Sequence, residues 1–145
     1  MIHLIALAQF VMRNPLALLA CVVASFAVGF VWHGLIFGKM WAKLAGLGNM
    51  SKKEAKKTML PGMTMSIMTA FIQALVLGRG LQIVYMGSPI HAIIVATLLW
   101  IPFTGMVLAT NYTWGRKPFK LFLIDAGGTL ASLWTIAAIM YFFIH

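Results

Sequence analysis

Two side chains able to exchange protons, His33 and Asp125, lie in apolar stretches of membrane-spanning length in this 145-residue sequence. His33 precedes Lys39 by six residues, and Asp125 follows Lys120 by five. At a rise of about 1.5 Å per helical residue, both lie roughly 7–9 Å inward from those lysines. A carboxylate inside a span costs about 2.5–3.5 kcal/mol, so it normally has a partner or a role. We therefore predict that Asp125 faces the bundle interior and contacts His33, or failing that Lys39 or Asn111.

Such a pair can have one of three roles. It can be a structural contact between helices, a site for a ligand, an ion or a proton, or a catalytic base with the acid that orients it. The first two remain open from the sequence. Catalysis is disfavoured, because the spans contain one pair of this kind and no suitable nucleophile accompanies it. We therefore predict that the protein is not an enzyme and has no catalytic residue.

The elements that position this pair follow from the composition. Hydrophobic residues make up 62% of the sequence and charged residues 9%, whereas ordinary globular chains are about 25% charged. A small soluble domain has too much surface to hide so much apolar material, so lipid must be the solvent. A spanning helix needs about 20 apolar residues, and its backbone must satisfy its own hydrogen bonds. We predict one all-α domain over residues 1–145, a bundle of four transmembrane helices at about 15–37, 59–77, 90–110 and 121–144.

The basic residues predict the orientation. Eleven Lys and Arg face two acids, for a formal net charge of +9. Nine of these bases lie in two connections, and Arg13 and Arg79 lie on the opposite side; the nine are Lys39, Lys43, Lys52, Lys53, Lys56, Lys57, Arg116, Lys117 and Lys120. Because cytoplasmic loops carry the excess of Lys and Arg, both termini are expected outside and the Lys-rich loops in the cytoplasm. We expect these bases to contact anionic lipids and not nucleic acid.

The first connection contains two further local signals. Apolar residues recur there at helical spacing, which indicates an interfacial helix continuing from the first span; they are Phe37, Met40, Trp41 and Leu44. Ser51 followed by Glu54 is a capping-box pattern, so a new helix is expected to begin there. Residues 1–12 are expected either at the outer membrane surface or as an outward extension of the first span.

Two prolines are expected to distort the spans. Pro61 lies close to the membrane entrance of the second helix, where it would introduce a kink. Pro102 lies near the middle of the third helix and would free the carbonyl group of Leu98.

Each span carries one stripe of small or polar residues. Small residues let membrane helices approach closely, and hydroxyl groups bond across the interface, so we interpret the stripes mainly as packing surfaces. The spacings Ser25-x-x-x-Gly29 and Gly128-x-x-x-Ser132 also predict self-association. The aromatic residues Trp32, Trp41, Tyr112 and Trp114 cluster toward the cytoplasmic ends and fit an interfacial aromatic belt.

Two stretches resemble a known family. The run Trp32-His33-Gly34-Leu35-Ile36-Phe37-Gly38-Lys39-Met40-Trp41 is similar to the first-helix signature of the bacterial family known as domain of unknown function 1761. The stretch from Asn111-Tyr112 to Lys120-Leu121-Phe122-Leu123-Ile124-Asp125-Ala126-Gly127 is similar to the segment that joins that family's last two helices. The similarity extends over nearly the whole chain in length and helix count.

The resemblance implies a small bacterial inner-membrane protein and brings no established activity. It draws attention to Trp32, Lys39, Asn111 and Asp125. Family members commonly have Tyr, Ser and Pro where this sequence has His33 and the two residues after it. A titrating role of His33 would therefore be specific to this sequence.

Three functional hypotheses follow. The first is a non-enzymatic membrane protein, either a homo-oligomer or an accessory subunit of a membrane complex. The second is a small transporter or channel with an ion or substrate site near Asp125. The third is an intramembrane enzyme that uses His33 and Asp125. The sequence has no zinc-type His/Cys spacing, no Gly-rich phosphate loop and no G-x-S-x-G motif, so we predict no metal and no cofactor.

Overall fold

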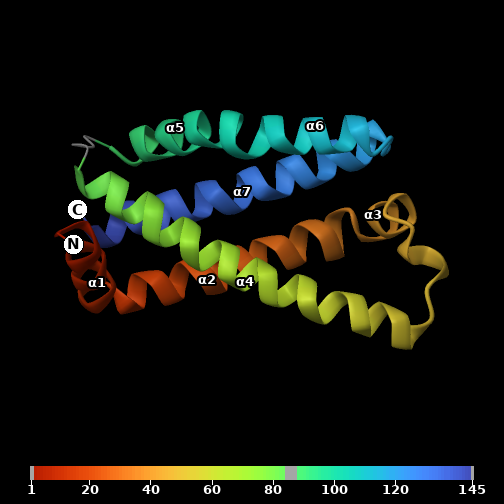
Figure 1. Cartoon of the computed structure of the whole chain (residues 1–145), viewed down its shortest axis with the longest axis horizontal. Helices are drawn as coiled ribbons and strands as arrows, with labels where there is room; N and C mark the ends of the chain where they lie inside the picture. The colour runs from red at the N-terminus through yellow and green to blue at the C-terminus, as the bar shows by residue number, and fades with distance from the viewer. Residues whose placement is uncertain (1, 84–87, 145) are drawn as a thin grey trace.

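The computed structural model describes residues 2–83 and 88–144, and this part of the chain is helical without any strand. Long helical segments run alongside one another as an elongated bundle (Figure 1). The bundle helices are α2 (Pro15–Phe30), α4 (Lys52–Ile83), α5 (Pro89–Trp100) followed by α6 (Met106–Trp114), and α7 (Phe119–Ile144). The shorter elements are α1 (Ile2–Arg13), α3 (Gly38–Leu44), the π-helical turns η1 (Val31–Ile36) and η3 (Ile101–Gly105), and the 3-10 turn η2 (Leu47–Asn49).

Four segments are long and apolar enough to cross a membrane. They are Pro15–Ile36, Lys56–Ile83, Pro89–Trp114 and Phe119–Ile144. Each covers one predicted span, so the predicted all-α fold with four transmembrane helices is confirmed. The second helix is longer than the predicted 59–77, because α4 already begins at Lys52 and continues to Ile83.

The predicted capping box explains where α4 begins. The backbone N–H of Ser51 donates to Glu54 Oε2 at 3.0 Å, and the backbone N–H of Glu54 donates to Ser51 Oγ at 3.3 Å. These two bonds satisfy amide groups that have no partner within the helix itself. Pro61 lies inside α4, which continues through this residue without interruption.

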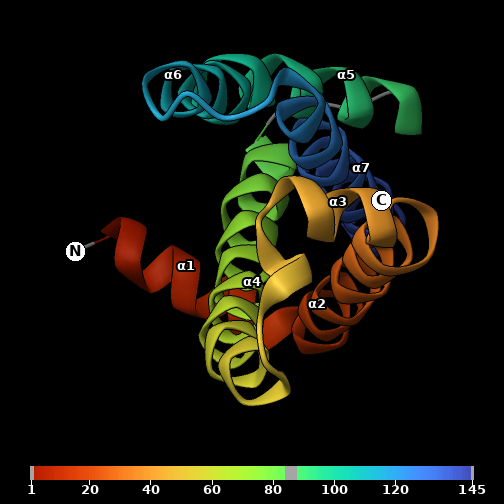
Figure 2. The ribbon, with the colours of Figure 1, turned by 90° about the vertical axis from the view of Figure 1, so that its right-hand side faces the viewer.

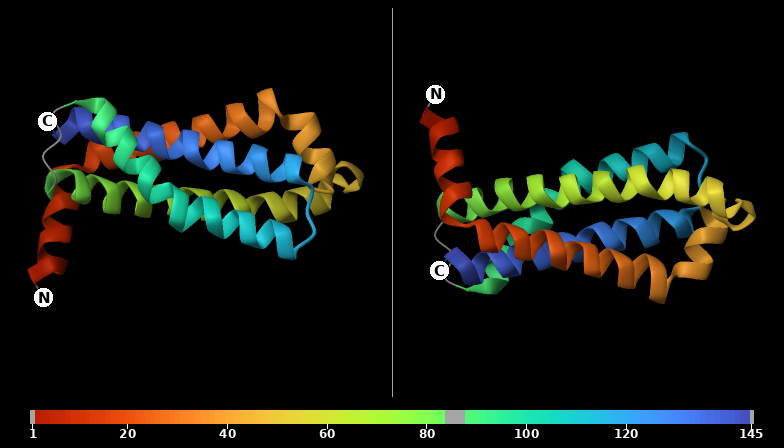
Figure 3. Two further views of the ribbon diagram at one scale, coloured as in Figure 1. Left: turned by 90° about the horizontal axis from the view of Figure 1, so that it is seen from above. Right: turned by 90° about the horizontal axis from the view of Figure 1, so that it is seen from below.

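The chain termini and the basic loops lie at opposite ends of the bundle. Both ends of the chain lie at one end, and the α3–α4 and α6–α7 connections lie at the other (Figures 1 and 3). We call these the terminal end and the lysine-rich end. Helix α1 turns away from α2 at the terminal end (Figure 3), because Asn14 adopts φ −126° and ψ 40° and so interrupts the helix. Residues 2–13 therefore form a separate helix and do not extend the first span.

Helix α7 is the central helix of the bundle. It packs against α2, α4 and α5 (Figure 2). The buried apolar core lies toward the terminal end, where Phe10 of α1 also contributes. Many of its members are alanines, which allow close packing of helices in lipid; the core contains Ala17, Leu18, Cys21, Ala74, Leu77, Leu81, Ala92, Ala96, Leu133, Ile136, Ala137 and Met140.

Two π-helical turns interrupt the first and third spans. In η3, which contains Pro102, the N–H of Met106 donates to the carbonyl of Ile101, five residues earlier. The wider turn fits the proline, which has no N–H to donate. In η1, the N–H of Phe37 donates to the carbonyl of Trp32 at 3.0 Å. Phe37 itself has φ −109° and ψ 4°, so the predicted helix is present as α3 but is separated from the first span. Its location at the membrane interface stays a prediction.

Candidate functional site

The carboxylate of Asp125 is the centre of a hydrogen-bonded cluster near the lysine-rich end. His33 Nε2 lies 3.1 Å from Asp125 Oδ1, and Trp41 Nε1 donates to the same oxygen at 2.9 Å. The hydroxyl group of Tyr112 donates to Oδ2. We call these four residues the Asp125 cluster. They come from η1, α3, α6 and α7, so one carboxylate connects four elements of the chain.

The contact between His33 and Asp125 that the equal depths predict is present, and Asp125 faces the bundle. The second ring nitrogen of His33, Nδ1, lies 3.3 Å from the carbonyl oxygen of Gly29. Both neighbours of the ring are acceptors. A neutral imidazole can donate to one of them, whereas an imidazolium can donate to both and would then form an ion pair with Asp125.

Two glycines of α7 allow η1 to approach this closely. A Cβ atom added at Gly127 would lie 2.7 Å from Trp32 Cζ2, and one added at Gly128 would lie 2.6 Å from His33 Cε1. Trp32 also donates from Nε1 to the carbonyl of Ile124 at 2.8 Å. The small residues of α7 at this point therefore pack against the first span of the same chain.

The predicted site residues are only partly brought together. Trp32, His33 and Asp125 lie in contact, as described, but Lys39 and Asn111 are exposed. Within the described part of the chain, neither of their side chains hydrogen-bonds to Asp125. Trp41, which is on the same helix as Lys39, donates to Asp125 instead.

Two members of the cluster, Trp41 and Tyr112, were interpreted from the sequence as part of an aromatic belt. Their N–H and O–H groups instead donate to Asp125, and both side chains are half-buried. Trp41 follows His33 by eight residues, but the break at Phe37 lies between them, so helical spacing alone does not bring the two side chains together. Trp114 fits the belt interpretation better, with 85% of its surface exposed.

The surroundings of Asp125 determine what the cluster can do chemically. The side chains of His33 and Asp125 are 28% and 23% exposed, so the pair is largely shielded, and both carboxylate oxygens already accept hydrogen bonds. Among the residues that the structure describes, no three His, Cys, Asp or Glu side chains gather where they could hold a metal ion. The arrangement resembles a structural junction more than an open coordination site, although its role as a binding site remains a prediction.

Comparison with protein families places this arrangement in a known group. Residues 16–141 match the family model described as Protein of unknown function (DUF1761), and this segment includes the whole Asp125 cluster. Comparisons with curated proteins and with solved structures gave no match. The match covers most of the chain and agrees with the resemblance of the two motif stretches. The chain therefore belongs to the DUF1761 family.

Proposed function

We propose that this protein is a non-enzymatic membrane subunit that assembles with a second copy of itself through helix α4. The observation that carries the proposal is the unpartnered half of this helix. Every residue from 56 to 69 is exposed. Bundle packing by α4 begins only further along, with Ala70, Ala74 and Leu77 among its buried residues. Half of a spanning helix is therefore free to pack against another protein.

The exposed half of α4 has the composition of a helix–helix interface. Gly62, Ser66 and Thr69 form one stripe, and Met59 and Met63 lie beside it. A Cβ atom added at Gly62 would meet nothing within 4 Å, so packing within the chain does not require this glycine. Small residues at four-residue spacing allow two membrane helices to approach closely, and flexible methionines adapt to the partner surface.

The proposed interface does not use the two spacings from which the sequence predicts self-association, Ser25-x-x-x-Gly29 and Gly128-x-x-x-Ser132. Ser25 and Gly128 are buried inside the chain, Gly128 against the ring of His33. One member of each spacing is therefore used within the chain, and α4 takes their place in the proposal. A two-fold pairing of α4 with α4 is self-complementary, as a symmetric dimer requires.

The Asp125 cluster supports a structural role more than transport or catalysis. An ion or substrate site needs ligands that can change partners, whereas the Asp125 carboxylate accepts bonds from His33, Trp41 and Tyr112. Each of those donors would lose its partner if a cation displaced it. In the proposal, the cluster fixes α3, η1 and α6 on α7 so that the bundle presents α4 in a defined position.

The proposal includes location and orientation. We place the protein in the inner membrane of a bacterium, with both termini outside and the lysine-rich end in the cytoplasm, because of the asymmetry in basic residues. The test uses Lys53→Cys in a Cys21→Ala background, since Cys21 is the single native cysteine. The engineered thiol should react with a membrane-impermeant reagent only after the cells are opened. Labelling in intact cells would contradict the orientation.

The assembly is tested by comparing Gly62→Leu with Gly80→Leu. Both glycines lie on α4, and neither would bring a new Cβ within 4 Å of the chain, so neither change should disturb the monomer fold. Wild type and Gly80→Leu should have the mass of a dimer in detergent-corrected measurements, whereas Gly62→Leu should be monomeric. Ser66→Cys in the Cys21→Ala background should form a disulfide dimer when native membranes are treated with the oxidant copper phenanthroline.

Three outcomes would contradict the assembly. A monodisperse wild-type monomer, with no partner copurifying from native membranes, would exclude a subunit role. A dimer that survives Gly62→Leu would place the interface away from α4. A monomer that copurifies with a different membrane protein would replace self-association by an accessory role.

A further inference from the structure

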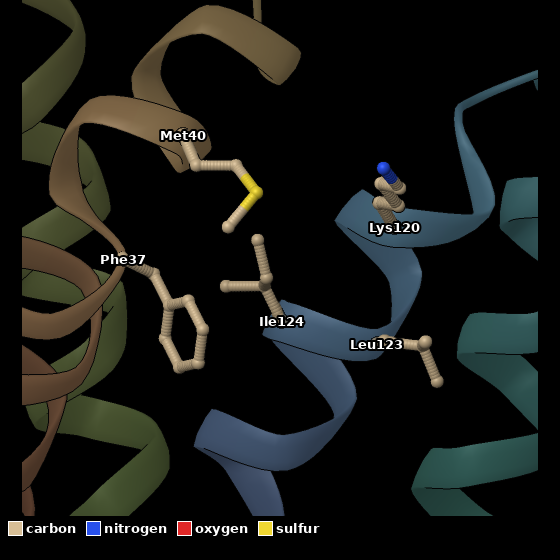
Figure 4. A pocket seen from close by; sticks show the side chains of 5 residues that line it. All are labelled: Phe37, Met40, Lys120, Leu123 and Ile124. Carbon is tan, nitrogen blue, oxygen red and sulfur yellow. The ribbon is translucent and has the colours of Figure 1, made fainter.

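An open groove of about 340 Å³ lies next to the Asp125 cluster, between α3 and the beginning of α7 (Figure 4). Phe37 and Met40 line one side, and Lys120, Leu123 and Ile124 line the other. Ile124 is buried and forms the floor, while Met40 and Leu123 are about half exposed. The volume lies near the lower limit of ordinary ligand pockets, and the lining is apolar apart from one amino group.

Trp32 and the Asp125 cluster together hold both walls of this groove in place. The carbonyl of Ile124 accepts the indole N–H of Trp32 at 2.8 Å, and the ring of Phe37 packs on Trp32 with its centroid 5.2 Å away. Trp41 joins the helix that carries Met40 to Asp125. The groove is therefore formed before a ligand enters, which reduces the ordering cost of binding.

Among the residues that the structure describes, Lys120 forms no ion pair with a carboxylate. The sequence contains two acids. Asp125 accepts from His33, Trp41 and Tyr112, and Glu54 is bonded to Ser51 in the capping box. The amino group of Lys120 stands at the edge of the groove in Figure 4. An exposed cation above an apolar groove at the end of a membrane bundle is complementary to an anionic group from outside the chain.

We propose that this groove binds an anionic phospholipid, with an acyl chain along Phe37, Met40 and Ile124 and the headgroup phosphate at Lys120. The apolar lining is complementary to a hydrocarbon chain, and Lys120 to a phosphate. A soluble metabolite phosphate would leave the apolar walls unfilled. The inference is independent of the α4 interface, because α4 contributes no lining residue.

The test measures lipid retained by the purified full-length protein. After delipidation in detergent, the protein is incubated with equal amounts of dioleoyl phosphatidylglycerol and dioleoyl phosphatidylcholine, and bound lipid is counted by native mass spectrometry. Wild type should retain the anionic lipid about fivefold better, the factor that corresponds to about 1 kcal/mol for one lysine near the headgroups.

Two pairs of variants separate the headgroup from the chain. Lys120→Gln should remove the preference for phosphatidylglycerol, whereas Lys53→Gln, an equal change of charge at an exposed position outside the groove, should keep it. Met40→Trp should fill the groove and lower retention of both lipids. Met106→Trp, at an exposed site on α6, should not. Circular dichroism confirms that each variant remains helical.

Three results would overturn the proposal. Equal retention of the two lipids by wild type would exclude selection of the anionic headgroup. An equal loss of preference in Lys120→Gln and Lys53→Gln would show that the charge acts diffusely and not at this groove. Complete displacement of the lipid by glycerol phosphate alone would exclude a contribution from the acyl chain.

Discussion

The two halves of the bundle are held together in different ways. In the half near the termini, buried apolar side chains from α1, α2, α4, α5 and α7 form one core. In the half near the lysine-rich end, α4 is exposed from residue 56 to 69, and polar side chains connect the remaining elements through Asp125. One half depends on close packing and the other on directed hydrogen bonds.

The difference reflects what lipid allows as a driving force. Apolar contacts between helices gain little in lipid unless the backbones approach closely, which alanines such as Ala17, Ala92 and Ala137 permit in the terminal half. A short helix such as α3, with seven residues, cannot make such an extended contact. Its Trp41 side chain instead donates one bond to Asp125. A local polar junction thus attaches α3 to the bundle, whereas the extended apolar core holds the long helices together.

Asp125→Ala removes the polar junction of the lysine-rich half, and we expect from it the largest loss of stability. Removal of the carboxylate leaves His33, Trp41 and Tyr112 without their acceptor, so the free energy of unfolding should fall by about 2–4 kcal/mol. Reversible unfolding in mixed detergent micelles measures the loss. Asp125→Asn retains an acceptor oxygen and should lose less.

The control is a double-mutant cycle with His33→Ala. Because each single change leaves a partner unsatisfied, the double variant should be more stable than the sum of the two losses predicts. Simple additivity would show that His33 and Asp125 do not interact energetically.

Substitution of one glycine in each half should give a loss of stability of intermediate size. Gly128→Ala would place a Cβ atom 2.6 Å from the ring of His33, whereas Gly78→Ala would place one 2.7 Å from Phe10 and 2.9 Å from the Met140 sulfur. The His33 ring is held by hydrogen bonds of the cluster. Phe10 comes from the peripheral α1, and the unbranched side chain of Met140, although buried, can change rotamer to make room. Gly128→Ala should therefore cost about 1–3 kcal/mol, and Gly78→Ala less, in the same unfolding assay.

Gly29→Ala is the matched control for both glycines, because its Cβ would meet nothing within 4 Å. It should leave stability unchanged or slightly increased, since alanine favours helix. A larger loss at Gly78 than at Gly128 would reverse the proposed difference between the two halves.

The smallest effect concerns the exposed capping box outside the spans. Hydrogen bonds from Ser51 lower the pKa of Glu54 from its usual 4.5. The folded pKa lies below the unfolded one, so this contribution is present above the unfolded value and is lost as the pH falls through the folded value. Ser51→Ala should raise the pKa of Glu54, measured by NMR titration of its side-chain carboxyl carbon. An unchanged pKa would show that the Ser51 side chain does not stabilise the charge.

The sequence allows the four spans, the capping box at Ser51 and the His33–Asp125 contact to be predicted, because each follows from a local pattern or from depth in the membrane. It does not predict the partners Trp41 and Tyr112, since the turn at Phe37 that redirects α3 leaves no distinctive pattern. The use of Gly128 within the chain was also not predictable. A small residue allows close approach equally well to its own bundle and to another protein.

Hydrogen exchange in Asp125→Ala tests the central claim most directly, that the cluster is a structural junction for the lysine-rich half. Loss of the carboxylate should accelerate amide exchange in α3 between Gly38 and Leu44. Amides around Ile136, in the apolar core, should exchange as in wild type. Unchanged exchange in α3, or an equal acceleration along the whole bundle, would contradict the claim.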